Sequence, residues 1–437
     1  MDRSDEPGVN GRSPSAIAVT SQAHIGSPVF RRVLALCIIV AMLDGYDTQV
    51  IALVAPVLTA TWELDKSDLG PVFAAGLVGL MLGSIVFGGL ADRLGRKPVI
   101  CAACFVFGLF ALLTPLATTL HELAALRFLT GIGLGAAIPN LMTLTAEHAS
   151  ANRRALAAGA MFCGFPLGAL IGGLAAPTVI ESWGWQGLFV WGGVLPLAMV
   201  APLSFLLVES PEWQRRKTGQ DLPKGQLRDL FASNLAAITP LLWLAFIANL
   251  LAMYFLMNWL PILFAANGAN LTQSAMTSVL LNLGGIAGCL GVTTLVDRLG
   301  ALRVMPVVFT LSAAAILAIG LIAPASNGMI IAIFLAGFGT MGAQMGGNAF
   351  AMSVYPTVLR AMGLGWALSM GRIGSIAGPL LGGLLLASQF APSDLFFAVA
   401  TIALVPAVIF IVIGRIAHRR GSDGRSALAS WRTASRH

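Results

Sequence analysis

Long apolar segments alternate with short polar connections along almost the whole chain. A helix of about 20 apolar residues crosses the hydrocarbon core of a bilayer, and most of the segments reach that length. They predict an all-α integral membrane protein with twelve transmembrane helices. The predicted spans are 33–58, 70–91, 98–118, 122–145, 155–178, 186–208, 240–264, 273–296, 304–323, 328–353, 360–387 and 394–414.

The polar stretch 209–239 is the longest connection and separates two groups of six predicted spans. We therefore expect an N-terminal six-helix bundle over 33–208 and a C-terminal six-helix bundle over 240–414. Residues 1–32 are polar and rich in Ser, Gly and Pro, a composition typical of a disordered tail. Residues 415–437 are expected to form a second tail.

The positive charges are concentrated on one side of the predicted spans. The chain is 57% hydrophobic and 10% charged, with a net charge of +7, whereas a soluble domain carries about 25% charged residues. The connections on one side hold Arg31, Arg32, Arg93, Arg96, Lys97, Arg153, Arg154, Arg215, Arg216, Lys217, Lys224, Arg228, Arg298, Arg303, Arg360 and Arg415, and those on the other side hold only Lys66. By the positive-inside rule, both termini and the 209–239 loop are cytoplasmic. The basic residues then face anionic lipid headgroups, and no nucleic-acid partner is expected.

The two groups of spans also repeat one another in sequence. LADRLGRKPVI (90–100) corresponds to LVDRLGALRVM (295–305), after the second span of each group. FLTGIGLGAA (128–137) corresponds to FLAGFGTMGA (334–343), in the fourth span of each group. Such a repeat predicts two pseudo-symmetric bundles with a binding site between them near the middle of the membrane.

Two acids interrupt the first predicted span. Asp44 and Asp47 are spaced i, i+3 and therefore share one helix face. A carboxylate in the middle of a bilayer costs roughly 2.5–3.5 kcal/mol on insertion scales, so this face is expected to meet a watery cavity and to bind the protons that drive transport. Arg127, in the fourth span, is a candidate partner. The alternatives are two acids that only pack between helices and an Arg127 side chain that extends to the membrane surface.

One sequence motif resembles the signature of the major facilitator superfamily. It comprises Gly88, Asp92, Arg93, Gly95 and Arg96 after the second span, and it recurs in part at Asp297 and Arg298, where Thr293 replaces the leading glycine. The resemblance implies a role in gating at the cytoplasmic side. Glycines allow close helix approach, and the acid and the arginines can form charge-assisted contacts that close the gate.

A narrower resemblance, to the aromatic acid:proton symporter family, covers nearly the whole chain. It is carried by Asp44-Gly45-Tyr46-Asp47, by the segment Met161–Pro166, by Asn258-Trp259-Leu260-Pro261 and by Gly371-Arg372-Ile373-Gly374. The family includes permeases for 4-hydroxybenzoate, benzoate and hydroxyphenylpropionate. The resemblance implies proton-coupled uptake of an aromatic carboxylate by alternating access, with Asp44, Asp47 and Arg127 in proton coupling.

Several further residues are candidates for substrate binding. Arg372 suits an anionic substrate, because a guanidinium binds a carboxylate through two hydrogen bonds. Gln344 and Asn348 are spaced i, i+4 and can hydrogen-bond a ring hydroxyl group. The expected apolar walls are Tyr254, Asn258, Trp259, Phe162 and Phe165. For a single aromatic residue, packing against lipid or other helices is the alternative role.

Other classes of function fit the sequence less well. A carrier for another organic anion, or an exporter, would have the same fold and gates. An enzyme would need a nucleophile or metal constellation, and the five histidines lie in loops, tails or helix ends. Cys101-x-x-Cys104 has no nearby histidine or acid, so neither a metal nor a cofactor is expected. We expect a monomer that spans the bacterial cytoplasmic (inner) membrane many times.

Overall fold

The computed structural model describes residues 27–150, 154–217, 227–232, 235–322 and 326–422. Most of the predicted N-terminal tail, the last 15 residues of the predicted C-terminal tail (423–437), and the basic residues Arg153 and Lys224 lie outside the described residues. Within them every regular element is a helix.

The helices follow the predicted spans closely. They are α1 (Pro28–Thr61), α2 (Leu69–Leu94), α3 (Arg96–Leu113), α4 (Leu120–His148), α5 (Arg154–Phe162), α6 (Gly164–Leu206), α7 (Pro211–Lys217), α8 (Leu235–Ala266), α9 (Leu271–Leu299), α10 (Ala301–Leu321), α11 (Asn327–Val354), α12 (Thr357–Ala387) and α13 (Pro392–Ser422), with 3-10 helices at Lys66–Asp68, Thr114–Leu116 and Leu227–Phe231. Ten helices of the described chain are long and apolar enough to cross a membrane. The all-helical membrane fold is therefore confirmed.

Two of the predicted spans meet at a kink with no loop between them. The segments 155–178 and 186–208 correspond to α5 together with α6, and the helical backbone of α6 is interrupted at Gly184, with φ 69° and ψ 177°. A positive φ is accessible to glycine at little cost, so the chain bends there without a loop. The α5–α6 segment counts as one of the ten membrane helices, whereas α1 is not among them.

Helix ends differ from the sequence prediction where local capping decides them. Helix α1 begins at Pro28 rather than at residue 33, because the Ser27 side chain accepts a hydrogen bond from the Phe30 backbone N–H at 3.2 Å. A proline at the first helical position also favours this start. The predicted inter-bundle loop contains α7, and α13 continues past residue 414 to Ser422.

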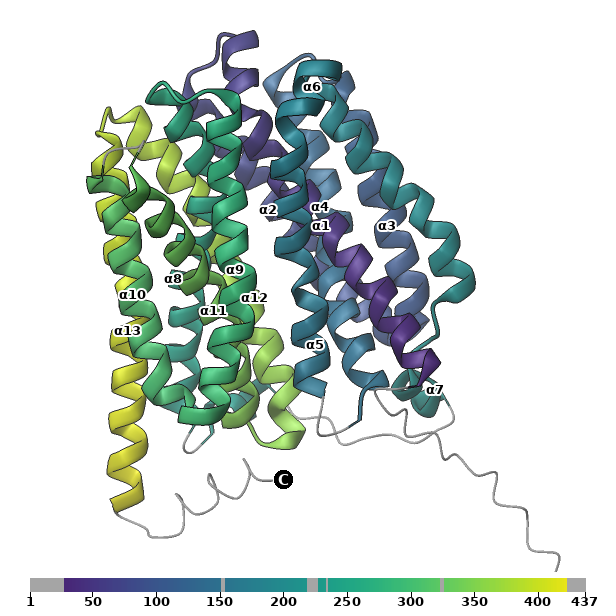
Figure 1. Ribbon diagram of the computed structural model, residues 1–437. Helices are drawn as coiled ribbons and strands as arrows, with labels where there is room; N and C mark the ends of the chain where they lie inside the picture. Colours follow the sequence, from purple (N-terminus) through teal and green to yellow (C-terminus); the bar gives the residue numbers. More distant parts are fainter. Residues whose placement is uncertain (1–26, 151–153, 218–226, 233–234, 323–325, 423–437) are drawn as a thin grey trace, which may run out of the picture.

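The two groups of six spans form two halves that stand side by side (Figure 1). The N-terminal half comprises α1 to α6, and the C-terminal half comprises α8 to α13. Equivalent glycines bring equivalent helices together: Gly79 and Gly83 of α2 lie against the α4 backbone, as Gly284 and Gly288 of α9 lie against the α11 backbone. The sequence repeat therefore corresponds to a repeat of helix packing.

The ends of the molecule differ in charge. The links α2–α3 and α9–α10 lie at the end where α1 begins and α13 ends, and we call it the basic end (Figure 1). Each link turns at a glycine with positive φ, 103° at Gly95 and 86° at Gly300. The α1–α2 connection, which holds Lys66, lies at the opposite end.

Candidate functional site

A large cavity lies between the two halves and extends toward the basic end. Its volume is about 650 Å³, within the usual range for small-molecule sites. Its wall comes from α1, α2, α4, α5, α6, α8, α11 and α12 and includes Asp44, Ser84, Gly88, Asp92, Phe162, Phe165, Leu250, Met253, Tyr254, Gln344, Asn348, Trp366, Ser369 and Arg372. Many predicted substrate and gating residues thus face a single space.

Asp44 and Arg372 face this cavity from different halves. Asp44 is 1% exposed. Its Oδ1 accepts a hydrogen bond from Thr48 Oγ1 at 3.3 Å, while its Oδ2 is buried with no hydrogen-bond partner among the described residues. Arg372 is half-buried and donates from Nη1 to the Tyr254 hydroxyl at 3.3 Å.

Three amides form a row in the C-terminal half, and two of them, Gln344 and Asn348, line the cavity. Asn249 Nδ2 donates to Gln344 Oε1 at 2.9 Å, and Gln344 Nε2 donates to Asn348 Oδ1 at 3.3 Å. These hydrogen bonds fix the orientation of each amide. The Asn348 Nδ2 group is the donor at the end of the row. Asn249 was not predicted as a site residue, although it is a polar residue within a strongly apolar span.

The predicted aromatic walls are only partly brought together. Phe162 and Phe165 stack with ring centroids 5.8 Å apart and both line the cavity. Trp259 lies elsewhere: it is fully buried, donates from Nε1 to the Pro379 carbonyl at 3.1 Å and packs edge-on against Phe73. Asn258 also lies outside this cavity, on the wall of a second, smaller space.

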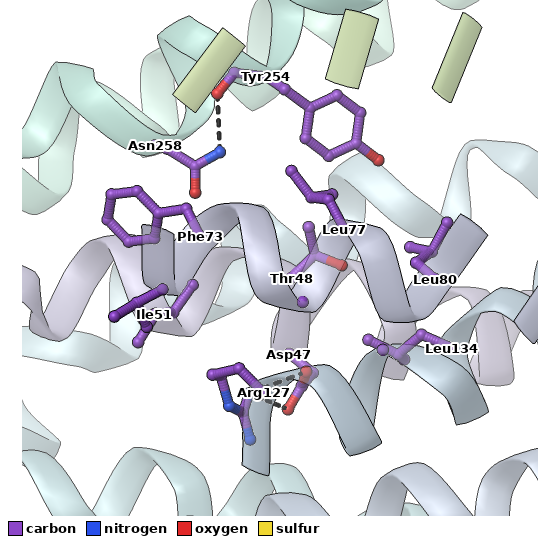
Figure 2. Close-up of a pocket in the computed structure, with 13 residues that line it drawn as sticks. Asp47, Thr48, Ile51, Phe73, Leu77, Leu80, Arg127, Leu134, Tyr254 and Asn258 are labelled. Carbon is purple, nitrogen blue, oxygen red and sulfur yellow. Dashed lines mark hydrogen bonds and ion pairs between the residues drawn. The ribbon is translucent and has the colours of Figure 1, made fainter. Parts of the chain in front are cut away.

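This second space, which we call the chamber, has a volume of about 40 Å³. Its lining includes Asp47, Thr48, Arg127, Tyr254 and Asn258, together with Ile51, Val72, Phe73, Gly76, Leu77, Leu80, Gly131 and Leu134 (Figure 2). Leu80, Leu134 and Tyr254 line both the chamber and the large cavity. The two spaces are therefore neighbours.

Asp47 forms a buried ion pair with Arg127 at the chamber wall. Arg127 Nη1 donates to Asp47 Oδ2 at 3.2 Å and to Oδ1 at 3.3 Å, and the two side chains are 5% and 3% exposed. Arg127 Nη2 donates to Thr114 Oγ1 at 2.6 Å and to Thr130 Oγ1 at 3.1 Å. Arg127 therefore points into the protein, not toward the membrane surface. The two threonines were not predicted.

The two halves are in contact at the opposite end. Gln49 Nε2 donates to the Met257 carbonyl at 3.0 Å and to Ser278 Oγ at 3.2 Å, and Asn282 Nδ2 donates to Gln49 Oε1 at 3.5 Å. All three bonds join the N-terminal half to the C-terminal half. Gly70 of α2 also lies against Gly383 of α12. A Cβ atom built at Gly70 would be 3.3 Å from the Cα of Gly383. The cavity is closed on this side.

The predicted gating loop forms a network within the N-terminal half and α7. Arg96 donates from Nε to Glu147 Oε1 at 3.1 Å and from Nη1 to Asn140 Oδ1 at 3.4 Å. Glu147 also accepts a hydrogen bond from the Ser210 hydroxyl. Glu209 Oε1 accepts from the Arg96 and Lys97 backbone N–H groups at 2.8 and 3.2 Å, which places an anion at the start of α3.

The other gating residues lie around this network. Trp213 of α7 donates from Nε1 to the Arg93 carbonyl at 3.3 Å. Gly88 and Asp92 line the large cavity, whereas Asp297 and Arg298, in the second copy of the motif, are exposed at the basic end. Glu147, the acid that anchors Arg96, was not predicted, since no spacing rule connects it to the loop.

Comparisons with known proteins place the chain among transporters. The sequence matches the family model described as Major Facilitator Superfamily over residues 37–359 and 292–437. It is 35% identical to a 4-hydroxybenzoate transporter of Pseudomonas aeruginosa, over 93% of this chain and 99% of the relative. It is 37% identical to a 3-(3-hydroxy-phenyl)propionate transporter of Escherichia coli, over 87% and 94% of the two chains. A gallate transporter of Pseudomonas putida is 34% identical, over 87% and 91%.

A solved structure gives the same fold. It is a bacterial homolog of the human lysosomal transporter Spinster in an inward-facing and unoccupied conformation. The TM-score is 0.62 at 18% sequence identity, over 94% of this chain and 98% of that chain. At this identity the likeness concerns the fold alone.

Proposed function

This chain belongs to the Major Facilitator Superfamily, and we propose that it takes up an aromatic carboxylate together with protons. It is a multi-pass membrane transporter rather than an enzyme. We place it in a bacterial cytoplasmic membrane, as a monomer with both termini in the cytoplasm. The names of the relatives support the substrate class, and the charge distribution supports the orientation.

The large cavity is the proposed substrate site. Its contents match an aromatic acid: a cation for the carboxylate at Arg372, stacked rings at Phe162 and Phe165, and an amide donor at Asn348. Arg372 already donates a hydrogen bond to the Tyr254 hydroxyl, so the guanidinium is oriented before the substrate binds. Orientation in advance reduces the entropy that binding costs.

Asp44 is the proposed proton-binding residue whose charge affects substrate binding. The observation that carries this proposal is that Asp44, with one carboxylate oxygen that has no partner among the described residues, lines the same cavity as Arg372. An ionised Asp44 attracts the Arg372 guanidinium and competes with a substrate carboxylate. A protonated Asp44 does not compete, so proton binding strengthens substrate binding, and by linkage the reverse also holds.

Asp47 is the second proposed proton site. Desolvation favours the neutral form of an acid, whereas a nearby cation favours the carboxylate. A transporter that exchanges these environments between two conformations has different proton affinities in the two states, as symport requires. Separation of Asp47 from Arg127 in the other conformation would produce that exchange.

The packing of the halves supports the proposed alternating access. The cavity extends toward the basic end, and the halves meet at the opposite end through Gln49 and the Gly70–Gly383 contact. With the basic end in the cytoplasm, this is an inward-facing state. Closure at the basic end would bring α2 toward α12. A Cβ atom added at Gly88 or at Gly365 would meet no described residue within 4 Å, so both helices have room to approach.

The Asp44→Asn variant tests the proposal. The amide resembles the protonated acid, so we expect counterflow exchange of substrate to persist while proton-driven accumulation is lost. Asp47→Asn should also abolish accumulation. The measurement is uptake of labelled benzoate, 4-hydroxybenzoate or 3-(3-hydroxyphenyl)propionate into proteoliposomes with an imposed inward proton gradient.

The same assay separates the alternatives. Accumulation at the wild-type level in both asparagine variants would make the acids packing groups and refute the proposed proton sites. Wild-type export of substrate under the same gradient would identify an exporter.

A further inference from the structure

Thr48 stands between the two acids and between the two spaces. It lies one residue after Asp47 and one helical turn after Asp44 on α1. Its hydroxyl donates to Asp44 Oδ1 at 3.3 Å, and the residue also lines the chamber. Figure 2 shows it between the Asp47–Arg127 pair and the Tyr254–Asn258 pair. It therefore touches the chamber on one side and the proposed proton site of the substrate cavity on the other.

The chamber has the size and polarity of a water site. A buried water needs roughly 10–15 Å³ of space accessible to its centre and two to four polar partners, and the chamber offers about 40 Å³. Asn258 Nδ2 donates to the Tyr254 carbonyl at 2.7 Å, and its amide oxygen is directed toward the chamber (Figure 2). Arg127 Nε is buried with no hydrogen-bond partner among the described residues.

The Asp47 carboxylate has acceptor capacity to spare. Both of its oxygens share the single Nη1 group of Arg127, at 3.2 and 3.3 Å. An ionised carboxylate has about four acceptor sites, and a buried charge is tolerated only when its hydrogen-bonding capacity is largely filled. Asp47 lines the chamber, so a water molecule bound there would find acceptor sites on this carboxylate.

We propose that the chamber binds water and that Thr48 transfers protons between this water and Asp44. The proposal rests on the proton symport proposed above. In the transfer, the Thr48 hydroxyl gives its proton to the Asp44 carboxylate and takes one from a chamber water, which takes one from protonated Asp47. One proton leaves Asp47 and one arrives at Asp44, and the hydroxyl group is restored.

The local geometry favours this route. The Thr48 hydroxyl already donates to Asp44, which is the direction needed for delivery to that acid. The residues common to both spaces are Leu80, Leu134 and Tyr254. The two leucines offer no hydrogen bond, and the Tyr254 hydroxyl already accepts one from Arg372. A hydroxyl group both donates and accepts, so Thr48 is suited to connect the two acids.

A matched pair of substitutions tests the transfer. Thr48→Val keeps the shape of the side chain but removes the hydroxyl, whereas Thr48→Ser keeps the hydroxyl. The full-length protein is reconstituted in liposomes, with whichever of benzoate, 4-hydroxybenzoate and 3-(3-hydroxyphenyl)propionate the wild type accumulates fastest as the probe. Proton-driven accumulation and counterflow exchange are measured for each variant.

We expect Thr48→Val to slow proton-driven accumulation by about 10-fold or more, because a positioned proton-transfer group contributes about 10²–10⁴-fold to a rate. Its counterflow rate should stay close to that of the wild type, which also shows that the variant folds. Thr48→Ser should accumulate substrate at close to the wild-type rate.

Three results would overturn the transfer role: wild-type accumulation in Thr48→Val, an equal loss of accumulation and counterflow in that variant, or an equal defect in Thr48→Ser. Failure of the proposed symport is a different outcome, since the wild type itself would then show no dependence of accumulation on the proton gradient.

Discussion

Asp44 and Asp47 lie one turn apart on the same helix but in different surroundings. Asp47 is held in an ion pair with Arg127 beside a chamber of about 40 Å³. One oxygen of Asp44 has no partner within the described residues, and this acid faces a cavity of about 650 Å³ that is also lined by Arg372. We therefore propose that the two acids, although they share one helix and are both buried, have different roles. One belongs to a closed pair that a conformational change must break, and the other belongs to a site that substrate can enter.

The largest expected effect concerns the two arginines. Arg127→Leu leaves Asp47 buried without its partner, and loss of one member of a buried pair costs about 3–5 kcal/mol. Arg372→Leu should cost much less stability, because Arg372 is half-buried on a large cavity that water can enter. Thermal unfolding of the two purified variants in detergent measures the difference. Equal losses in unfolding temperature would show that the two acid–arginine surroundings are equivalent, contrary to this account.

A second, smaller effect concerns substrate affinity. Arg372→Lys keeps the charge but loses the planar fork that binds a carboxylate through two bonds. Loss of a hydrogen bond to a charged group costs about 1.5–3 kcal/mol, so the apparent affinity should fall roughly 10- to 100-fold while expression is unchanged. Arg303→Lys, at an exposed position of α10, is the control and should behave as the wild type. Wild-type affinity in Arg372→Lys would make Arg372 a structural residue.

The smallest effect concerns the closed end of the interface. Gln49→Leu removes three hydrogen bonds between the halves, one of them long, and we expect it to favour the state open at the opposite end by about 1–2 kcal/mol. Val279 of α9 lies against Gly173 of α6 at this end. In Val279→Cys protein, labelling by an impermeant maleimide from the outer side should then become roughly 5- to 30-fold faster. An unchanged rate would show that Gln49 does not hold the halves together.

Sequence patterns were sufficient for the fold because membrane helices are marked by long apolar runs. The spans, the two halves and their repeat were predicted from these runs, from basic residues and from glycines whose packing the structure now describes. The exceptions were local. The start of α1 depends on the Ser27 cap, and the bend of α6 depends on Gly184, which replaces a loop between two spans.

The candidate site was less predictable because it depends on how helices are rotated against one another. A polar residue in an apolar span marks Asp44, Arg127 and Arg372 as unusual, but spacing alone does not decide that Arg127 pairs with Asp47. For the same reason Trp259 was expected at the cavity, although α8 directs it toward α12 instead. Asn249, which contacts the lining residue Gln344, and Gln49, which joins the halves at the closed end, are uncharged and carry a weaker sequence signal.

The central claim is that uptake of an aromatic carboxylate is driven by protons. The direct measurement is accumulation of labelled 4-hydroxybenzoate, benzoate and 3-(3-hydroxyphenyl)propionate in proteoliposomes under an inward proton gradient, with the membrane potential clamped. The account predicts that at least one of them rises above its outside concentration and that a protonophore abolishes the rise. Mere equilibration of all three, unaffected by the proton gradient, would contradict it.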